Sequence, residues 1–228
     1  MMTLPVKWAG LLGLAVLVGC NQGPDGPSLQ LELFQLASAK VGSIGKKEVE
    51  AETPPLTRAA LDTLTEPYLE VTLEKRDIVA YLSQQQQRRD DTPGLIEVWR
   101  TTDDITLTLR SGVLVASRGM GDDILSASAL VAAGPGPISG GERRYQIRGL
   151  DNQAQSLTMA CTLQDLGPET VEIVELRHAT RHLQERCEGG GGLVVNDYWV
   201  DSRSGRVWQS RQWAGPTIGY LRIRQITI

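Results

Sequence analysis

The sequence predicts a mainly β protein whose antiparallel meander closes into a barrel or a barrel-like sandwich, after one or two short N-terminal helices. Polar and apolar residues alternate along several segments from residue 68 onward, and short turn-forming segments separate these runs. The 228-residue length allows one ordinary domain, and its content of 41% hydrophobic residues is close to the average of soluble globular proteins. Because a long meander must protect its edge strands, we expect the sheet to close or stack.

The first element along the chain is a candidate lipoprotein signal peptide at 1–19. It contains a single basic residue and no acidic residue, and its apolar stretch over 8–18 is too short to span a bilayer as a mature helix. The stretch ends in the letters LVGC at 17–20, which follow the bacterial lipobox pattern. We therefore predict lipidation of Cys20 after cleavage, with an ordinary secretory signal as the alternative.

A flexible tether is expected next, at 20–28, because this segment is polar and rich in Gly and Pro. It would connect the lipid to a single β-rich periplasmic domain at 29–228. Asn21 follows the cysteine at the position where an aspartate often signals retention in the inner membrane. The expected location is therefore the periplasmic face of the outer membrane, where the lipid would anchor the protein.

Two helices are expected near the start of the domain. Pro54 and Pro55 precede residues 56–64, whose apolar positions recur at helical spacing, and the segment ends before Pro67. The apolar positions of residues 29–40 are also compatible with a helix. Both would lie before the β-rich part of the chain.

Strands are expected wherever apolar and polar residues alternate. Residues 105–110 and 144–148 alternate strictly, and 157–163 place a row of apolar residues on one face. Residues 171–177 also read as one continuous strand. Two segments interrupt the pattern, a Gly/Pro loop at 130–141 and a glycine-rich turn at 188–192.

The cysteines suggest a disulfide. If Cys20 carries lipid, Cys161 and Cys187 remain, and export to an oxidising compartment favours their pairing. The bond would close a loop of about 27 residues, which the chain-entropy model values at roughly 3–4 kcal/mol. Two unpaired thiols are the alternative, because sequence spacing does not report the geometry of the pair.

The charged and titratable residues argue against several function classes. A formal net charge of −4 does not favour nucleic-acid binding through a basic surface. His178 and His182 would share one face of a helix and could hold zinc there, but the surrounding sequence favours a strand and contains no H-E-x-x-H motif. We therefore expect surface histidines, no metal site and no cofactor.

Two groups of residues are candidates for chemistry on polysaccharide. Asp122 and Asp123 are adjacent carboxylates, whereas a glycosidase needs its pair roughly 5–10 Å apart, on opposite sides of the scissile bond. Aromatic rings can stack on sugar rings while carboxylates bind hydroxyls, as the cluster of Trp199, Asp201, Trp208 and Trp213 would allow. Core packing of these tryptophans is the alternative, because large aromatic residues dominate sheet cores.

A resemblance to a known family lies in segments 96–100 (IEVWR), 111–124 (SGVLVASRGMGDDI), 196–201 (NDYWVD) and 205–216, which includes GRVWQSRQW. With the lipobox and the overall length, these segments resemble the YjbF-type group 4 capsule polysaccharide lipoproteins. The resemblance implies an all-β, barrel-like periplasmic domain tethered by lipid and encoded with capsule or exopolysaccharide genes. It supplies no catalytic residues. Only Cys20 carries over with a role, as the lipid site.

We therefore expect a non-catalytic accessory lipoprotein of exopolysaccharide or capsule assembly or export. Its expected partners are the membrane, the polymer, and an outer-membrane export porin or a second periplasmic protein. The alternatives are a polysaccharide-modifying enzyme that uses Asp122, Asp123 or Asp201, and a structural envelope protein that binds a protein partner. The candidate polymer or partner surface comprises Arg118, Asp122, Asp123, Trp199, Asp201, Trp208 and Trp213.

Overall fold

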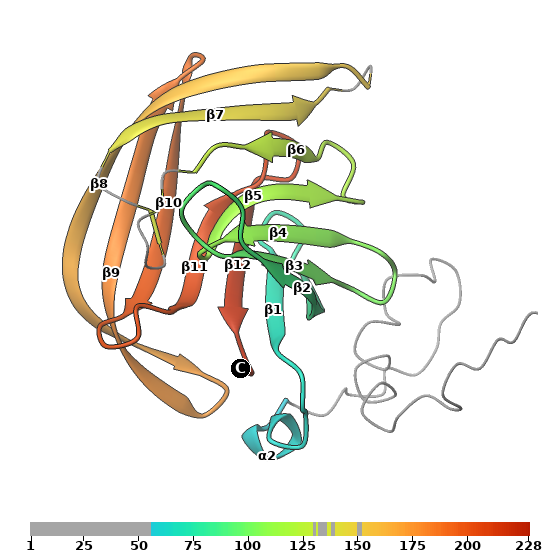
Figure 1. The fold of residues 1–228 in the computed structure, drawn as a ribbon, viewed down its shortest axis with the longest axis vertical. Coiled ribbons are helices and arrows are strands. Elements are labelled where there is room, and N and C mark those ends of the chain that lie inside the picture. Colours follow the sequence, from blue (N-terminus) through green and yellow to red (C-terminus); the bar gives the residue numbers. More distant parts are fainter. Residues whose placement is uncertain (1–55, 130, 132–135, 138–139, 150–151) are drawn as a thin grey trace, which may run out of the picture.

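The structure is a computed structural model that describes residues 56–129, 131, 136–137, 140–149 and 152–228. The predicted signal peptide, Cys20, the tether and the helix over 29–40 lie outside these residues. The described chain is mainly β, and its single antiparallel sheet of 12 strands curls into a nearly closed barrel (Figure 1). Among the described residues, no helix is both long enough and apolar enough to cross a membrane.

One helical turn precedes the strands, which vary widely in length. The longest strands form a hairpin that curves around the barrel (Figure 1). The elements are α2 (Arg58–Leu61), β1 (Tyr68–Leu73), β2 (Ile78–Arg88), β3 (Ile96–Arg100), β4 (Thr106–Arg110), β5 (Val113–Arg118), β6 (Ile124–Ala127), β7 (Gly141–Arg148), β8 (Ala154–Ile173), β9 (Leu176–Gly189), β10 (Gly192–Asp201), β11 (Val207–Trp213) and β12 (Tyr220–Gln225).

The strand order explains how the barrel closes. Each strand pairs with the next one along the chain, except that β5 and β6 form the two edges of the sheet. The first and last strands pair instead, with Leu69 opposite Gln225 and Leu73 opposite Leu221. The pairing of β1 with β12 therefore closes the barrel. The remaining gap lies between β5 and β6, near the middle of the sequence.

The helix expected over 56–64 is present but is only one turn long. Thr57 caps its start, because the Thr57 Oγ1 accepts a hydrogen bond from the Ala60 N–H at 3.3 Å. Leu61 is buried in an apolar cluster with Ile173 and Ile226. A helix of one turn is marginal on its own, so burial of Leu61 contributes more to its stability than helix propensity does.

The strands predicted from alternation are confirmed at 105–110, 144–148 and 157–163, which fall on β4, β7 and β8. The single strand expected at 171–177 is wrong. A two-residue turn at Val174 and Glu175 separates β8 from β9, and Ile173 pairs with Leu176 across it. Both turn residues have positive φ, 42° and 68°. Such turns usually contain Asn or Gly, so this one carries no sequence signal.

Three apolar clusters support the barrel, and the smallest of them contains Val113, Val131 and Tyr198. The largest one fills the interior and includes Trp99, Leu107, Tyr145 and Leu221. A second, smaller one forms where the tip of the β8–β9 hairpin meets α2 and the end of β12. Full burial of such a side chain contributes about 1.5–3 kcal/mol, so the interior cluster is the main stabilising element.

Candidate functional site

A cavity of about 410 Å³ lies inside the barrel, at the end where the β2–β3, β4–β5 and β10–β11 turns meet. Leu69, Leu109 and Ile223 form an apolar wall. Gln84, Gln87, Glu97, Arg206 and Ser210 contribute polar groups to the lining. The volume falls within the range of small-molecule sites, and a mixed lining of this kind suits a ligand with both polar and apolar surfaces.

Glu97 is the acidic residue of the cavity. It lies on β3, and the Gln84 Nε2 donates a hydrogen bond to its Oε1 at 3.1 Å. Burial raises the pKa of the Glu97 carboxyl, while the nearby Arg206 and the amides of Gln84 and Gln87 oppose this shift. Glu97 is thus a partly desolvated acceptor that faces the cavity together with amide donors.

Trp99 also lines the cavity and shares a strand face with Glu97. Its side chain is 1% exposed, and its indole Nε1 has no hydrogen-bond partner among the described residues. A buried donor left unpaired costs about 1–3 kcal/mol, so such groups are rare in folded proteins. The Trp99 N–H is therefore enclosed by the wall beside the cavity and is not exposed to the cavity itself.

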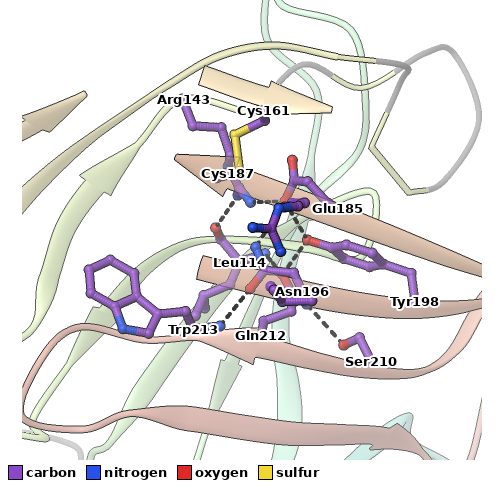
Figure 2. Close-up of polar contacts among 12 residues, drawn as sticks. Leu114, Arg143, Cys161, Glu185, Cys187, Asn196, Tyr198, Ser210, Gln212 and Trp213 are labelled. Atoms are coloured by element: carbon purple, nitrogen blue, oxygen red, sulfur yellow. Dashed lines mark hydrogen bonds and ion pairs between the residues drawn. A yellow bond between two sulfur atoms is a disulfide. The ribbon is translucent and has the colours of Figure 1, made fainter. Parts of the chain in front are cut away.

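A buried ion pair forms the centre of a polar network inside the barrel (Figure 2). The Arg143 Nη1 lies 2.6 Å from the Glu185 Oε2, and the two side chains are 5% and 7% exposed. The Asn196 Nδ2 donates to the same Glu185 oxygen at 2.8 Å. The Tyr198 hydroxyl donates to the Gln212 Oε1 at 3.2 Å, so charge and hydrogen bonds extend across strands β7, β9, β10 and β11.

Gln212 connects this network to β5. Its Oε1 accepts from the Leu114 N–H at 2.8 Å, and its Nε2 donates to the Gly112 carbonyl at 2.9 Å. The Arg143 Nη2 lies 3.4 Å from the Leu114 carbonyl. Segments 111–124 and 205–216, which both resemble the lipoprotein family, are therefore in direct contact inside the barrel.

The gap between the edge strands β5 and β6 is bridged by Arg118. Its guanidinium donates to the carbonyls of Ser117, Ile124 and Leu125, at 2.5, 3.0 and 2.9 Å. The Ile124 N–H donates to the Ser117 Oγ at 3.0 Å. Side chains here replace the backbone ladder that joins the other neighbouring strands.

Asp123 holds the turn between the same two strands. Its carboxylate accepts from the Ser117 Oγ and from the backbone N–H groups of Gly119 and Met120, at 3.0–3.2 Å. The side chain is buried. Asp122 accepts instead from the Thr217 hydroxyl, which connects this turn to the one between β11 and β12. Both carboxylates are therefore engaged in holding turns.

Trp199 and Trp208 belong to the smaller apolar cluster, and each ring stacks on a histidine. The ring centroids of His182 and Trp199 are 4.5 Å apart, and those of His178 and Trp208 are 3.7 Å apart. The His182 Nε2 lies 2.9 Å from an oxygen of Asp197. The two histidines thus have separate partners, and burial lowers the pKa of His178.

Asp201 is next to this stacked group. It accepts from the Trp208 Nε1 at 3.2 Å and from the backbone N–H groups of Arg203 and Ser204. These bonds hold the pKa of the Asp201 carboxyl well below its usual range, with the Ser204 N–H as the largest contributor. Asp201 therefore organises the turn between β10 and β11.

The predicted surface residues do not share one set of contacts. Trp199, Asp201 and Trp208 are neighbours, whereas Arg118 and Asp123 hold the β5–β6 gap. The Trp213 ring instead packs edge-to-face on Tyr145 at 5.3 Å and against the interior core. Core packing, the alternative considered for these tryptophans, accounts for Trp213.

Cys161 and Cys187 are joined by a disulfide across β8 and β9, in agreement with the prediction. A carboxylate oxygen of Glu185 lies within 4.8 Å of both sulfur atoms, at a spacing that would suit a metal ion. The sulfurs are bonded to each other, so they offer no thiolate ligands. The described residues therefore favour a structural disulfide at this position.

The cavity residues and the buried Arg143–Glu185 pair belong to no motif that identifies a site from the sequence. A signal was available, because Arg143 precedes Tyr145 and Ile147 on one face of β7, as Glu185 precedes Cys187 on β9. A charged residue in register with core-facing residues indicates an interior polar group. The strand β8 lies between β7 and β9 in the sheet, and 42 residues separate Arg143 from Glu185, so no local pattern indicated their contact.

The comparisons with known proteins agree with this architecture. The family model described as group 4 capsule polysaccharide lipoprotein gfcB, YjbF, matches residues 28–226. The chain belongs to the YjbF family. Among solved structures, the YjbF-family chain resembles the hypothetical lipoprotein YmcC from Escherichia coli K12, with a TM-score of 0.63 and 18% sequence identity over 81% of this chain and 98% of that one. No curated protein shows significant similarity.

Proposed function

We propose that this YjbF-family chain is a non-catalytic lipoprotein that assists exopolysaccharide or capsule assembly or export. The supporting observation is the family match over 28–226, whose description refers to a capsule polysaccharide lipoprotein. Lipid on Cys20 would anchor the barrel at the periplasmic face of the outer membrane. There the domain would contact nascent polymer, an export porin or a second periplasmic protein.

The contacts of the candidate acids support a role without catalysis. The Asp123 carboxylate is buried and accepts three hydrogen bonds, and Asp201 is held by the backbone of its own turn. A general acid or base must reach a proton on its substrate, and these carboxylates face protein donors. Asp122 is the more accessible member of the adjacent pair, so it is the acid through which the enzyme alternative is best tested.

A deletion strain of the source bacterium tests the proposal. Loss of the gene should reduce surface polymer, the wild-type gene should restore it, and a Cys20→Ala variant should not, because it would lose its membrane anchor. Density-gradient fractionation should place the wild-type protein with outer-membrane markers. Normal polymer in the deletion strain would overturn the proposal.

The same strain separates the two alternatives. An Asp122→Asn variant should restore polymer fully, because a carboxylate held by Thr217 has no chemical role in this proposal. If the variant fails and only the wild-type protein shortens purified polymer, the enzyme alternative is correct. If polymer is unaffected by deletion while the protein co-purifies with one envelope protein, the structural alternative is correct.

A further inference from the structure

A second cavity, of about 220 Å³, lies at the opposite end of the barrel from the 410 Å³ cavity. Its lining comes from the β1–β2, β3–β4 and β5–β6 turns and from the strands that these turns join. Several apolar side chains of the lining are only half-buried, so their surfaces reach the cavity: Leu73, Ile78, Ala80, Ile105 and Met120. The side chains that line it from the barrel interior are therefore apolar.

The unequal reach of neighbouring strands leaves this second cavity open. On β2, the pairing with β1 extends to Ile78, but the pairing with β3 ends at Ser83, which lies opposite Arg100. The chain then turns at 101–105 and returns as β4. Residues 78–82 of β2 therefore extend past the end of β3, and the cavity lies between them and the β3–β4 turn.

The uncharged polar groups beside this cavity are already engaged with each other. In the β3–β4 turn, the Thr101 Oγ1 accepts from the Ile105 N–H at 2.9 Å, and the Thr101 N–H donates to the Ile105 carbonyl at 2.9 Å. On β2, the Ser83 Oγ accepts from the Gln85 Nε2 at 2.7 Å. A saccharide would bury hydroxyl groups here with few partners, at a cost, whereas an aliphatic chain needs none.

Charged residues of the lining lie at its solvent edge. The Arg100 Nε donates to the Asp104 Oδ1 at 2.9 Å, so the charge of Arg100 is compensated within the β3–β4 turn. Arg76 and Asp103 also line the cavity, are exposed, and form no ion pair among the described residues. A head group that carries one negative and one positive charge would meet an opposite charge for each at this edge.

We infer that the second cavity binds one acyl chain of a zwitterionic membrane phospholipid, whose head group stays at the solvent edge near Arg76 and Asp103. Water in an apolar cavity lacks hydrogen-bond partners, and such cavities bind apolar molecules instead. Each methylene group that enters would be removed from water against Leu73, Ile78 and Met120. The choice of a membrane lipid rests on the proposed function, in which a lipid anchor holds the barrel beside a bilayer.

The experiment follows the methionine methyl groups of the full-length protein by NMR during titration with hexanoate, octanoate and decanoate. The protein is dissolved in digitonin, a steroid detergent without a straight alkyl chain. The Met120 methyl signal should shift to saturation, because Met120 lines the cavity. Met159 is the internal control, since it is 2% exposed in the interior core and does not line the cavity, so its signal should not move. Affinity should rise about fourfold per added methylene, which corresponds to about 0.8 kcal/mol.

Ala80→Leu should weaken octanoate binding about tenfold, because the larger side chain occupies space that the acyl chain needs. Ala179→Leu is the matched control, since it makes the same change at an exposed position of β9 that does not line the cavity. Its affinity for octanoate should equal that of the wild type. Circular dichroism and thermal unfolding verify that both variants are folded, and equal affinities of two folded variants would overturn the site. If Ala80→Leu does not fold, the wild-type titration still decides the question.

A second titration replaces octanoate by octanoyl lysophosphatidylethanolamine, which adds a zwitterionic head group to the same chain. It should bind more tightly than octanoate, and Arg76→Gln should reduce the difference. Weaker binding would overturn the phospholipid in favour of a free fatty acid. No Met120 shift with any of these compounds would overturn the acyl-chain site and leave the cavity to an apolar side chain of a protein partner. Surface polymer in the deletion strain is measured separately, so failure of this site and failure of the proposed function are distinguishable.

Discussion

At the scale of residues, the buried Arg143–Glu185 pair is the most demanding feature of the barrel. Both side chains are desolvated, and the Arg143 Nε has no hydrogen-bond partner among the described residues. Transfer of two charges from water is costly, and their attraction compensates only when other hydrogen bonds complete the site. Asn196 supplies one such bond to Glu185, which makes the pair part of a larger polar core.

Glu185→Gln should strongly destabilise the protein, because it leaves the Arg143 charge buried without its counter-charge. We expect a loss of about 3–5 kcal/mol in the free energy of unfolding, measured by urea denaturation. Glu142→Gln is the matched control, since Glu142 pairs with Arg144 at the exposed surface and should contribute less than about 1 kcal/mol. Similar losses in the two variants would show that the buried pair has no special importance.

Asp201 should make stability sensitive to acid. Its pKa is lowered in the folded protein, so the folded state favours the ionised carboxyl relative to the unfolded chain. This contribution is fully present above the unfolded pKa of about 3.9 and disappears as the pH falls through the lower folded value. Unfolding free energy measured below about pH 4 should therefore fall less steeply for Asp201→Asn than for wild type. Parallel curves would contradict this assignment.

At the scale of elements, the gap between β5 and β6 shows how side chains can replace a backbone ladder. Edge strands carry free backbone groups, which invite pairing with other chains. Here Arg118 binds carbonyls on both strands, and Gln212 and Arg143 reach the backbone of Leu114 from inside. The edges of the sheet are thus partly satisfied within the molecule.

Arg118→Lys should loosen this gap, because an ammonium group cannot reproduce the planar fork of guanidinium donors. We expect a loss of about 1 kcal/mol in unfolding free energy. Amide hydrogen exchange should accelerate in Val113–Arg118 and Ile124–Ala127, and should not change in β9. Arg186→Lys, at an exposed ion pair with Glu188, is the control and should leave exchange at the gap unaltered. Unchanged exchange in the Arg118 variant would exclude a bridging role.

At the scale of the whole molecule, the barrel consists of strands that pair with their neighbours in sequence and of one pairing between the first and last strands. The hairpin of β8 and β9 is its longest part and is cross-linked by Cys161–Cys187. Both sulfur-bearing residues belong to the interior core, next to the polar network. The disulfide therefore constrains the unfolded chain within the region that forms the interior core of the folded barrel.

Replacing both cysteines by alanine should lower the unfolding free energy by about 3–4 kcal/mol in the chain-entropy model. The measurement is chemical denaturation with and without dithiothreitol. Reductant should destabilise the wild-type protein by a similar amount and leave the double variant unchanged. A wild-type unfolding curve that does not respond to complete reduction would show that the cross-link contributes nothing to stability.

The fold was largely predictable, because alternation reports which strand face is buried. That signal identified β4, β7 and part of β8, and turn-rich segments implied a meander. It failed at Val174–Glu175, where two residues without turn character adopt positive φ. Strand pairing over long sequence distances also left no local signal, so the position of the gap could not be derived.

The site was much less predictable. The expected disulfide formed. Arg118 and Asp123 were predicted for a polymer or partner surface, and the structure adds that they hold the gap and the turn beside it, which no local pattern indicated. In the sequence, Glu97 and Trp99 stand out only as members of segment 96–100, which resembles the lipoprotein family. Their importance comes from a cavity built by several strands, and a cavity is a property of the assembled fold rather than of a local pattern.

The pairing of the first strand with the last has a kinetic consequence. Almost the whole described chain separates Leu69 from Gln225, so forming this ladder requires closure of a very long loop. Each of the other ladders joins strands that are neighbours in sequence, and such local hairpins form early. We therefore expect ring closure to be a late event in folding, with β12, the strand synthesised last, completing the barrel only after the rest of the domain has emerged.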